Sequence, residues 1–308
     1  MAGIGDDAAV WQPSRSHLSV ITTDALIDGV HFDAAGMDAR AVGHRAMAAN
    51  LSDVAAMGAR PVLATVALGV AAQTATEWIL DCYRAMSALA GEYGAAIAGG
   101  DIVRAPALAL SLTIVGEVSR SRLKLRSGGR SGDIVALTGP LGASRAGLEL
   151  LRRPELAVDA ADARAARAAF ATPRPRVREG RWLAASSHVH ALMDSSDGLS
   201  TDLARLAVAS GCGAEIGRVA VHPAALAVAR AAGHEPRTYA LDGGEDFELI
   251  AAVAPRAFAH LAEGFERRFG TPLLAVGKLE REPGLRLRED DGAVRGLTPA
   301  GYDHFAGG

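Results

Sequence analysis

The sequence predicts a mixed α/β protein of two domains. Short apolar stretches that suit strands alternate with longer stretches of helical periodicity, which indicates sheets covered by helices. A polar, basic run rich in Gly and Ser, residues 119–132, interrupts this alternation near the middle of the chain. With 308 residues, 49% of them hydrophobic, the chain is long enough to bury a core in each of two domains.

The expected elements of the N-terminal domain, residues 1–118, follow from apolar patterns. Leu18, Val20 and Ile21 favour a strand that ends at Asp24, and Gly58-Ala59-Arg60-Pro61 ends the helix that follows it. In chain order we expect a strand over 17–23, a helix over 39–57, a strand over 62–68, a helix over 74–93, a short strand leading into Gly99-Gly100-Asp101 and a strand over 107–118.

Residues 119–132 are expected to link the domains, because they combine Gly and Ser breakers with a cluster of basic residues. Beyond this linker, residues 133–308 are predicted to form a second α/β domain. Its expected elements are a strand over 133–138, helices over 142–152 and 159–170, a strand over 189–193 and a helix over 199–210. The dipeptides of Thr172-Pro173-Arg174-Pro175 end the second of these helices.

Composition excludes several classes of protein. Thirty-two basic against 35 acidic residues give a net charge of −3, which supplies no basic surface for nucleic acid or anionic lipid. Only Cys82 and Cys212 are present and they form no C-x-x-C pair, so neither a disulfide framework nor a thiolate zinc site is indicated. The sequence has no signal-peptide pattern and no apolar stretch long enough for a bilayer, and we expect a cytoplasmic protein.

The most informative pattern is the position of the acidic residues. Asp6-Asp7, Asp24, Asp101, Asp194 and Asp197 lie beside Gly, Ser or Thr, mostly just after expected strands, where α/β sheets gather their ligand sites. Clustered carboxylates and hydroxyls suit Mg²⁺, which prefers oxygen ligands and often bridges to phosphates. For any one of these acids alone, capping of the following helix is the better interpretation.

Asp53 differs from these acids because it is expected within a helix. It lies three residues after Asn50, in a stripe with Ala46, Ala49 and Met57 that faces a core. A buried carboxylate is costly unless it is paired, hydrogen-bonded or bound to a metal. The alternative, a rotated stripe that leaves Asp53 in solvent, stays open.

Familiar catalytic motifs are absent from the sequence. Nothing matches the G-x-x-x-x-G-K-[ST] phosphate loop, and Gly3-Ile4-Gly5-Asp6-Asp7-Ala8 has no preceding strand that would make it a dinucleotide fingerprint. There is no H-E-x-x-H, no G-x-S-x-G and no Cys beside an evident His partner. Metal-assisted phosphate chemistry is the enzymatic class that remains.

A series of motifs resembles the thiamine-monophosphate kinase family, within the wider aminoimidazole-ribonucleotide-synthetase-like superfamily. The resemblance runs nearly end to end and implies the two-domain PurM-like fold. The motifs are Gly3-Ile4-Gly5-Asp6-Asp7, Thr22-Thr23-Asp24, Gly29-Val30-His31-Phe32, Asn50-Leu51-Ser52-Asp53-Val54-Ala55-Ala56-Met57-Gly58-Ala59, Gly99-Gly100-Asp101, Arg126-Ser127-Gly128, Asp194-Ser195-Ser196-Asp197-Gly198-Leu199, Gly243-Gly244-Glu245-Asp246-Phe247-Glu248-Leu249 and Gly301-Tyr302-Asp303-His304-Phe305.

The last two motifs distinguish this family from its relatives. The early acidic loop, the helix with Asp53 and the Asp-x-Ser-Asp-Gly loop also resemble ribonucleotide-cyclising, selenophosphate-making and hydrogenase-maturation enzymes. The Gly-Gly-Glu-Asp-Phe-Glu-Leu segment and the terminal Gly-Tyr-Asp-His-Phe resemble the thiamine-phosphate branch. A selenophosphate synthetase would be expected to carry a reactive Cys in the N-terminal Gly loop, and this sequence has no Cys there.

The resemblance implies a role for each matching residue. Eight residues would ligate several Mg²⁺ ions directly or through water: Asp7, Thr22, Thr23, Asp24, Asp53, Asp101, Asp194 and Asp197. ATP would be contacted by Gly100, Asp101, Arg126 and Ser196. The thiamine-phosphate pocket would be lined by His31, Glu245 and Tyr302. Catalysis would depend on Asp24, Asp101, Arg126 and Asp197.

The implied reaction is direct in-line transfer of a phosphoryl group from ATP to thiamine monophosphate, by a homodimer joined through strands of the N-terminal domain. Family members usually carry a further segment before the Gly-Ile-Gly-Asp-Asp motif, so the position of the natural start stays open. Two alternatives also stay open: a binding protein with impaired catalysis, and another ATP-dependent enzyme of the superfamily.

Overall fold

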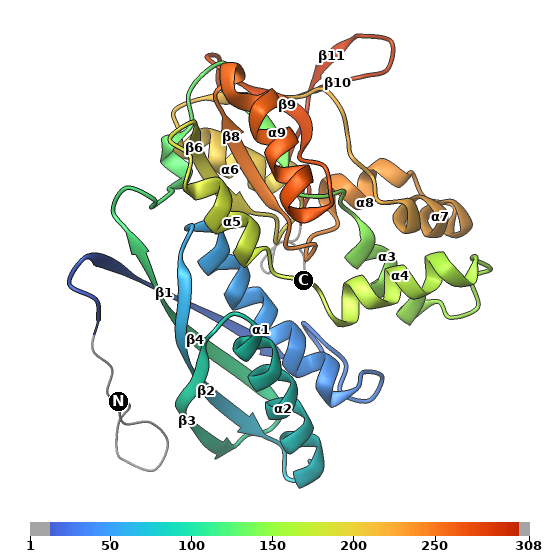
Figure 1. The fold of residues 1–308 in the computed structure, drawn as a ribbon. Coiled ribbons are helices and arrows are strands. Elements are labelled where there is room, and N and C mark those ends of the chain that lie inside the picture. The colour runs from blue at the N-terminus through green and yellow to red at the C-terminus, as the bar shows by residue number, and fades with distance from the viewer. Residues whose placement is uncertain (1–12, 302–308) are drawn as a thin grey trace.

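The structure, a computed structural model, describes residues 13–301. Its N-terminal half holds a four-stranded sheet in the order β1-β4-β2-β3, in which β2 and β3 are parallel and the other neighbours antiparallel. The strands are β1 (His17–Ile27), β2 (Arg60–Val70), β3 (Ala96–Arg104) and β4 (Ala109–Ser119). Helices α1 (Ala39–Ala56) and α2 (Thr76–Glu92) belong to this half (Figure 1).

The C-terminal half contains a seven-stranded mixed sheet in the order β11-β10-β7-β9-β5-β8-β6. Its strands are β5 (Ile134–Leu137), β6 (Val189–Asp194), β7 (Gly213–Ile216), β8 (Leu249–Val253), β9 (Leu274–Glu280), β10 (Leu285–Arg288) and β11 (Val294–Gly296). Its helices are α3 (Ala143–Arg152), α4 (Ala160–Ala171), α5 (Val177–Ala184), α6 (Leu199–Ala209), α7 (Pro223–Ala232), α8 (Pro236–Asp242) and α9 (Pro255–Phe269).

The predicted α/β class and two-sheet organisation are confirmed. Between the two sheets the chain passes through the 3₁₀ turn η1 (Arg126–Gly128), which lies inside the segment predicted as a linker. The boundaries at residues 118 and 133 stay a prediction. Within residues 13–301, no helix is both long and apolar enough to cross a membrane.

Helix α1 lies between the two halves of the molecule (Figure 1). It packs on β1, β4 and α2 of its own half and on α5 and β6 of the other half. Side chains are buried all around this helix, as expected for a helix enclosed by protein. The core that includes Leu51 and Val54 of α1 extends to Val177 and Leu249 of the C-terminal half.

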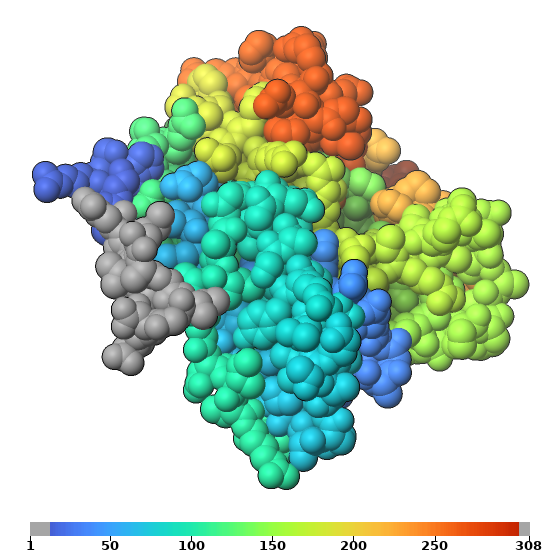
Figure 2. All heavy atoms as spheres, turned by 60° about the horizontal axis from the view of Figure 1, so that its bottom comes forward, coloured from blue at the N-terminus to red at the C-terminus, as the bar shows by residue number. Residues whose placement is uncertain are grey.

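The loop between α4 and α5 is a second contact between the halves. His44 Nε2 lies 2.9 Å from the carbonyl oxygen of Pro173, and the Tyr93 hydroxyl donates a 3.0 Å hydrogen bond to the carbonyl of Pro175. In Figure 2 the yellow-green chain that includes α4 lies against the blue and teal N-terminal half. The two halves therefore bury a common interface around α1.

Strand β1 is longer than the sequence suggested. Its side chains alternate, with Leu18, Val20, Thr22, Asp24 and Leu26 on the more buried face that packs against α1. We call this the inner face of the sheet and the opposite one the open face. Because alternate residues of a strand point to opposite faces, Thr22 and Asp24 lie on the inner face and Thr23 on the open face.

The expectation that the acids follow strands is wrong for two of them. Asp24 lies within β1 and Asp101 within β3, whereas Asp194 is the last residue of β6. The pair Gly99-Gly100 does not end β3, because Gly100 pairs with Val66 of β2 in a parallel ladder. A Cβ atom added at Gly100 would lie 1.9 Å from the carbonyl oxygen of Val66, so glycine is needed there for close approach of the strands.

Candidate active site

Helix α1 carries three polar side chains that contact two different strands. Asn50 is fully buried, and its Oδ1 accepts a 3.2 Å hydrogen bond from the backbone N–H of Asp24. The Thr22 hydroxyl of β1 donates to the Asp53 carboxylate. The buried hydroxyl of Ser52 donates a 2.7 Å hydrogen bond to Asp194 Oδ2 in β6. One helix thus joins β1 and β6.

These contacts bring together four carboxylates, which we call the inner carboxylate cluster: Asp24, Asp53, Asp194 and Asp197. Burial, and after it the negative charges of Asp53 and Asp197, raise the pKa of Asp24 to about 6. Burial also raises the pKa of Asp53, against the opposing effects of the Thr22 hydrogen bond and the Arg126 charge. Burial and the charge of Asp53 raise the pKa of Asp194. The hydrogen-bonded interpretation of Asp53 is therefore confirmed and the solvated alternative is wrong.

Asp197 belongs to the loop that joins β6 to α6. Its backbone N–H donates a 2.9 Å hydrogen bond to Asp202 Oδ2, and its carboxylate forms an ion pair with Arg205. Burial raises the pKa of Asp202 to about 7. Gly198 has a φ of 106°, and a Cβ there would lie 2.7 Å from the carbonyl oxygen of Leu241. The turn before α6 therefore requires glycine.

Residues 243–248 pack on this loop through backbone hydrogen bonds. The N–H of Glu245 donates to the carbonyl of Ser196 at 2.8 Å, and the N–H of Phe247 donates to the carbonyl of Ser195 at 3.0 Å. Glu245 and Phe247 both have positive φ angles, of 58° and 53°. Non-glycine residues adopt such angles only where surrounding contacts compensate the strain. The motif that carries Glu245 and the motif that carries Asp194 and Asp197 are thus one structural unit.

Arg126 approaches the inner carboxylate cluster from η1. Its positive charge lowers the pKa values of Asp53 and Asp194, against the larger effect of burial on each. The backbone of the turn is held in place, since the Arg126 carbonyl accepts a 2.6 Å hydrogen bond from Ser210 Oγ. A Cβ at Gly128 would lie 2.1 Å from the carbonyl oxygen of His190 in β6. This close approach seats the turn on the strand that ends at Asp194.

The structure does not bring Thr23 and Asp101 together with the inner carboxylate cluster. Thr23 Oγ1 lies on the open face and donates to the carbonyl of Leu112 at 2.9 Å. Asp101 of β3 is exposed and lies opposite Ala67 of β2 in the sheet. In the same row across the strands, Ala67 lies opposite Ser111 of β4, and Ser111 lies opposite Ala25 of β1. Since directly paired residues share a face, Asp101 lies on the open face with Thr23. The predicted ligands therefore form an inner and an outer group.

The structure describes only some of the residues predicted to line the thiamine-phosphate pocket. His31 follows β1, and its Nδ1 accepts a 3.0 Å hydrogen bond from the backbone N–H of Ile27. Asp7 and Tyr302 lie outside the described residues. The chain leading to Tyr302 does run along the site, because Gly301 donates its N–H to Thr201 Oγ1 at 3.1 Å and leaves no room for a Cβ beside the Asp197 carbonyl.

Sequence reasoning missed several polar residues of this site. Ser52 and Asn50 were seen only as parts of a motif, and Arg45, Asp202 and Arg205 were not considered. Arg45 is only 2% exposed, and its Nη2 donates a 2.6 Å hydrogen bond to Glu245 Oε1. The sequence did contain a signal for two of them. Arg45 and Asn50 lie in a stretch expected to be enclosed by apolar residues, and buried polar groups need hydrogen-bond partners.

The inner carboxylate cluster suits a hard divalent cation. Its side chains offer only oxygen ligands, and burial, followed by the charges of neighbouring carboxylates at Asp24 and Asp194, raises their pKa values. Among the residues that the structure describes, no group of three His, Cys, Asp or Glu side chains could hold a metal alone. In proteins, Mg²⁺ usually takes one or two carboxylates and completes its shell with water and substrate phosphate.

Comparison with known proteins agrees with this architecture. Residues 5–118 match the model of the AIR synthase related protein N-terminal domain, and residues 130–289 match that of the C-terminal domain. A thiamine-monophosphate kinase of Rhodopirellula baltica is 38% identical, over 98% of this chain and 90% of its own.

Two solved structures resemble the fold closely. Thiamine-monophosphate kinase from Stenotrophomonas maltophilia K279a has a TM-score of 0.85 and 34% identity, over 95% of this chain and 91% of its own. A structure described as AaThiL complexed with AMPPCP and TMP has a TM-score of 0.82 and 30% identity, over 98% of this chain and 92% of its own. The predicted fold is that of these proteins, and this chain belongs to the thiamine-monophosphate kinase family within the AIR synthase related proteins.

Proposed function

We propose that this protein transfers the terminal phosphoryl group of ATP to the phosphate of thiamine monophosphate, giving thiamine diphosphate and ADP. The observation that carries the proposal is the union of two motifs, in which the segment with Glu245 is hydrogen-bonded to the carbonyls of Ser195 and Ser196 beside the inner carboxylate cluster. An acceptor bound at Glu245 would lie next to carboxylates suited to metal and phosphate. The AaThiL complex with AMPPCP and TMP supports both substrates.

The carboxylates have an electrostatic role in this proposal. Two phosphorylated substrates repel each other and the cluster, and like charges 4 Å apart cost about 4 kcal/mol at an effective dielectric of 20. Mg²⁺ supplies the neutralising charge when bound. Several ions are proposed, shared between the inner and outer groups, and the residues proposed to hold them are those expected from the resemblance: Asp7, Thr22, Thr23, Asp24, Asp53, Asp101, Asp194 and Asp197.

The remaining site residues would position the two substrates. Arg126 faces the cluster and is suited to ATP phosphate oxygens, because a guanidinium offers several donors in a fixed plane. Gly100, Asp101 and Ser196 complete the proposed ATP contacts. His31, Glu245 and Tyr302 are proposed to hold the acceptor.

The chemistry itself requires little from the protein beyond position. The acceptor is a phosphate monoester with a second pKa of about 6, so its attacking oxygen is already anionic near neutral pH and needs no general base. In-line transfer then depends on alignment and charge neutralisation. We assign these roles to Asp24, Asp101, Arg126 and Asp197.

We also propose a homodimer joined through the open face of the N-terminal sheet. This face presents Ile21, which is 69% exposed, next to Thr23 on the same strand. A second copy on this face would lie beside Thr23 and Asp101, two of the residues proposed to hold metal or ATP.

Cys82 and Cys212 are buried free thiols, which supports the cytoplasmic location expected from the sequence.

The test is incubation of the purified chain with ATP, Mg²⁺ and thiamine monophosphate, with and without a chelator, followed by phosphorus NMR. Formation of thiamine diphosphate that the chelator abolishes is the expected result. Binding of ATP without turnover would contradict the proposal and favour a binding protein. Turnover with a different acceptor only would favour another enzyme of the superfamily.

A further inference from the structure

Arg45 is the largest fully buried side chain of the described molecule, and it reaches across the interface between the two halves. Its Nη1 donates to the carbonyl oxygen of Phe170 in α4, and its Nη2 donates to Glu245 Oε1 at 2.6 Å. The guanidinium carbon lies 4.1 Å from the centre of the Phe170 ring. Both hydrogen-bond partners of this α1 residue thus belong to the C-terminal half.

The charge of Arg45 needs an explanation. Its Nε is buried and has no hydrogen-bond partner within residues 13–301, so the guanidinium is not fully satisfied where it lies. Burial of an incompletely satisfied charge is costly, and a well-packed apolar side chain would serve stability equally well. The charge of Arg45 is paired with the Glu245 carboxylate, and this ion pair is the contact that an apolar side chain could not make.

Glu245 presents its carboxylate in a defined way. Its backbone is constrained by a φ of 58° and by the hydrogen bond from its N–H to Ser196, while its side chain remains 38% exposed. Among the residues that the structure describes, Arg45 is the only one whose side chain hydrogen-bonds this carboxylate, and it occupies Oε1. Oε2 is left able to accept a hydrogen bond from a bound molecule.

We propose that Arg45 is a positioning residue for the acceptor substrate. It fixes the Glu245 carboxylate in one orientation, so that Oε2 accepts a hydrogen bond from the amine group of the acceptor, on the pyrimidine ring at the end far from its phosphate. This inference rests on the proposed function, in which Glu245 contacts thiamine monophosphate, and it adds the residue that sets the direction of that contact. Arg45 itself touches Glu245 rather than the substrate.

Helix α1 also sets the distance between the two ends of the site. Arg45 and Asp53 are eight residues apart on this helix, which corresponds to about 12 Å at 1.5 Å per residue. An extended acceptor held by Glu245 near Arg45 could therefore place its phosphate near Asp53. A rigid helix keeps this spacing, since both anchoring side chains move together.

The experiment compares substrate constants in the full-length chain. Arg45→Met removes the charge at similar length, Arg45→Lys keeps the charge with one donor group, and Arg40→Met is the matched control. Arg40 lies on the same helix and is 63% exposed, and within residues 13–301 its side chain pairs only with Asp81. The KM values for thiamine monophosphate and ATP, kcat and the melting temperature are measured for each variant.

We expect Arg45→Met to raise the KM for thiamine monophosphate about tenfold or more, since the contact at stake is a charge-assisted hydrogen bond. The KM for ATP should change by less than about twofold. Arg45→Lys should fall between Arg45→Met and the wild type, and Arg40→Met should match the wild type. An unchanged acceptor KM, or equal increases in both KM values, would overturn the proposal and leave Arg45 a purely structural residue.

A double-mutant cycle with Glu245→Gln completes the test. If Arg45 acts through Glu245, Arg45→Met should change the acceptor KM little once Glu245 is altered, whereas independent roles give additive effects and contradict the proposal. If Arg45→Met does not fold, Arg45→Lys and its cycle decide. If the wild type makes no thiamine diphosphate, the proposed function fails, and the same comparison is made with the Kd for thiamine monophosphate from calorimetry.

Discussion

The Ser52 hydroxyl of α1 donates a 2.7 Å hydrogen bond to Asp194 Oδ2 at the end of β6, and so connects two residues 142 positions apart in the sequence. Both residues are buried, at 0% and 2% exposure, so water cannot replace this bond. The same helix holds the β1 side of the cluster through Asn50 and Asp53. The arrangement of the inner carboxylate cluster therefore depends on the packing of α1 between the two sheets.

Replacing Ser52 with alanine should destabilise the fold and reduce turnover together. The Asp194 carboxylate would lose its neutral donor while remaining buried, and an unsatisfied buried acceptor costs about 1–3 kcal/mol. The pKa of Asp194, already raised by burial, should rise further. Urea unfolding and kcat measure the two effects. Ser121→Ala, at an exposed serine of the linker, is the control and should match the wild type; an unaltered Ser52→Ala enzyme would contradict this account.

Asp24→Asn should separate activity from stability. Because burial, and after it the charges of Asp53 and Asp197, raise the pKa of Asp24, removal of its charge relieves desolvation and repulsion and should leave the melting temperature equal to or above that of the wild type. Turnover should fall by about 100-fold or more, the scale of losing one electrostatic contact to a reacting group. Steady-state kinetics with Mg²⁺ and a thermal melt test this. Asp290→Asn, in the exposed turn after β10, should change neither, and full activity of Asp24→Asn would refute the metal role.

Much of this site could be predicted from the sequence, and the missing part has a physical reason. The strand over residues 17–23 and the helical stripe of Asp53 were readable, because their patterns are local. The continuation of β3 through Gly99 and Gly100 was not, since it depends on the approach of Val66 from another strand. The Ser52–Asp194 and Arg45–Glu245 contacts join segments 142 and 200 positions apart, and no local pattern encodes them.

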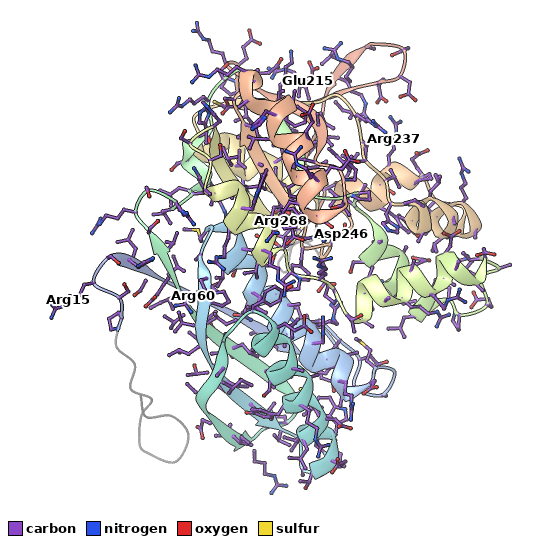
Figure 3. The ribbon with its side chains drawn as sticks, in the orientation of Figure 1. Arg15, Arg60, Glu215, Arg237, Asp246 and Arg268 are labelled. Atoms are coloured by element: carbon purple, nitrogen blue, oxygen red, sulfur yellow. The ribbon has the colours of Figure 1, made fainter. Side chains whose placement is uncertain are left out.

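Stability should depend on pH through Asp246, which lies in the middle of the molecule (Figure 3). Its carboxylate accepts hydrogen bonds from the backbone N–H groups of Gly142 and Ser144, at 2.6 and 3.1 Å, at the start of α3. Burial nevertheless raises its pKa to about 7. A raised carboxyl pKa means that the folded state binds a proton that the unfolded state releases near pH 4, so stability falls as pH rises from about 4 to about 7.

Asp246→Asn should therefore flatten the pH profile of the melting temperature. The wild type should lose stability between pH 5 and pH 8, and the variant should lose less over the same interval, because its amide does not titrate. The variant should also be less stable at pH 5, where an amide cannot reproduce both backbone contacts. Calorimetric melts at the two pH values provide the measurement, with Asp290→Asn as the control. Parallel profiles for Asp246→Asn and the wild type would show that another group sets the dependence.

Two adjacent glycines offer a matched test of the close approach between β2 and β3. A Cβ at Gly100 would lie 1.9 Å from the Val66 carbonyl oxygen, whereas a Cβ at Gly99 meets no atom within 4 Å. Gly100→Ala should force the strands apart and cost about 1–3 kcal/mol, the usual range for overpacking. Gly99→Ala should be tolerated, since it adds one methyl group in open space.

Binding of ATP should be weakened in the Gly100→Ala variant and unchanged in the Gly99→Ala variant. Asp101 is the next residue of β3, so displacement of Gly100 should also shift its carboxylate and weaken binding of ATP by the Gly100→Ala variant. Urea unfolding and calorimetric titration with ATP and Mg²⁺ measure stability and affinity for both variants. Equal stability of the two alanine variants would show that β3 can move away from β2 without cost. A destabilised Gly100→Ala variant with unchanged ATP affinity would instead remove both Gly100 and Asp101 from the proposed ATP site, because their positions would then not matter for the nucleotide.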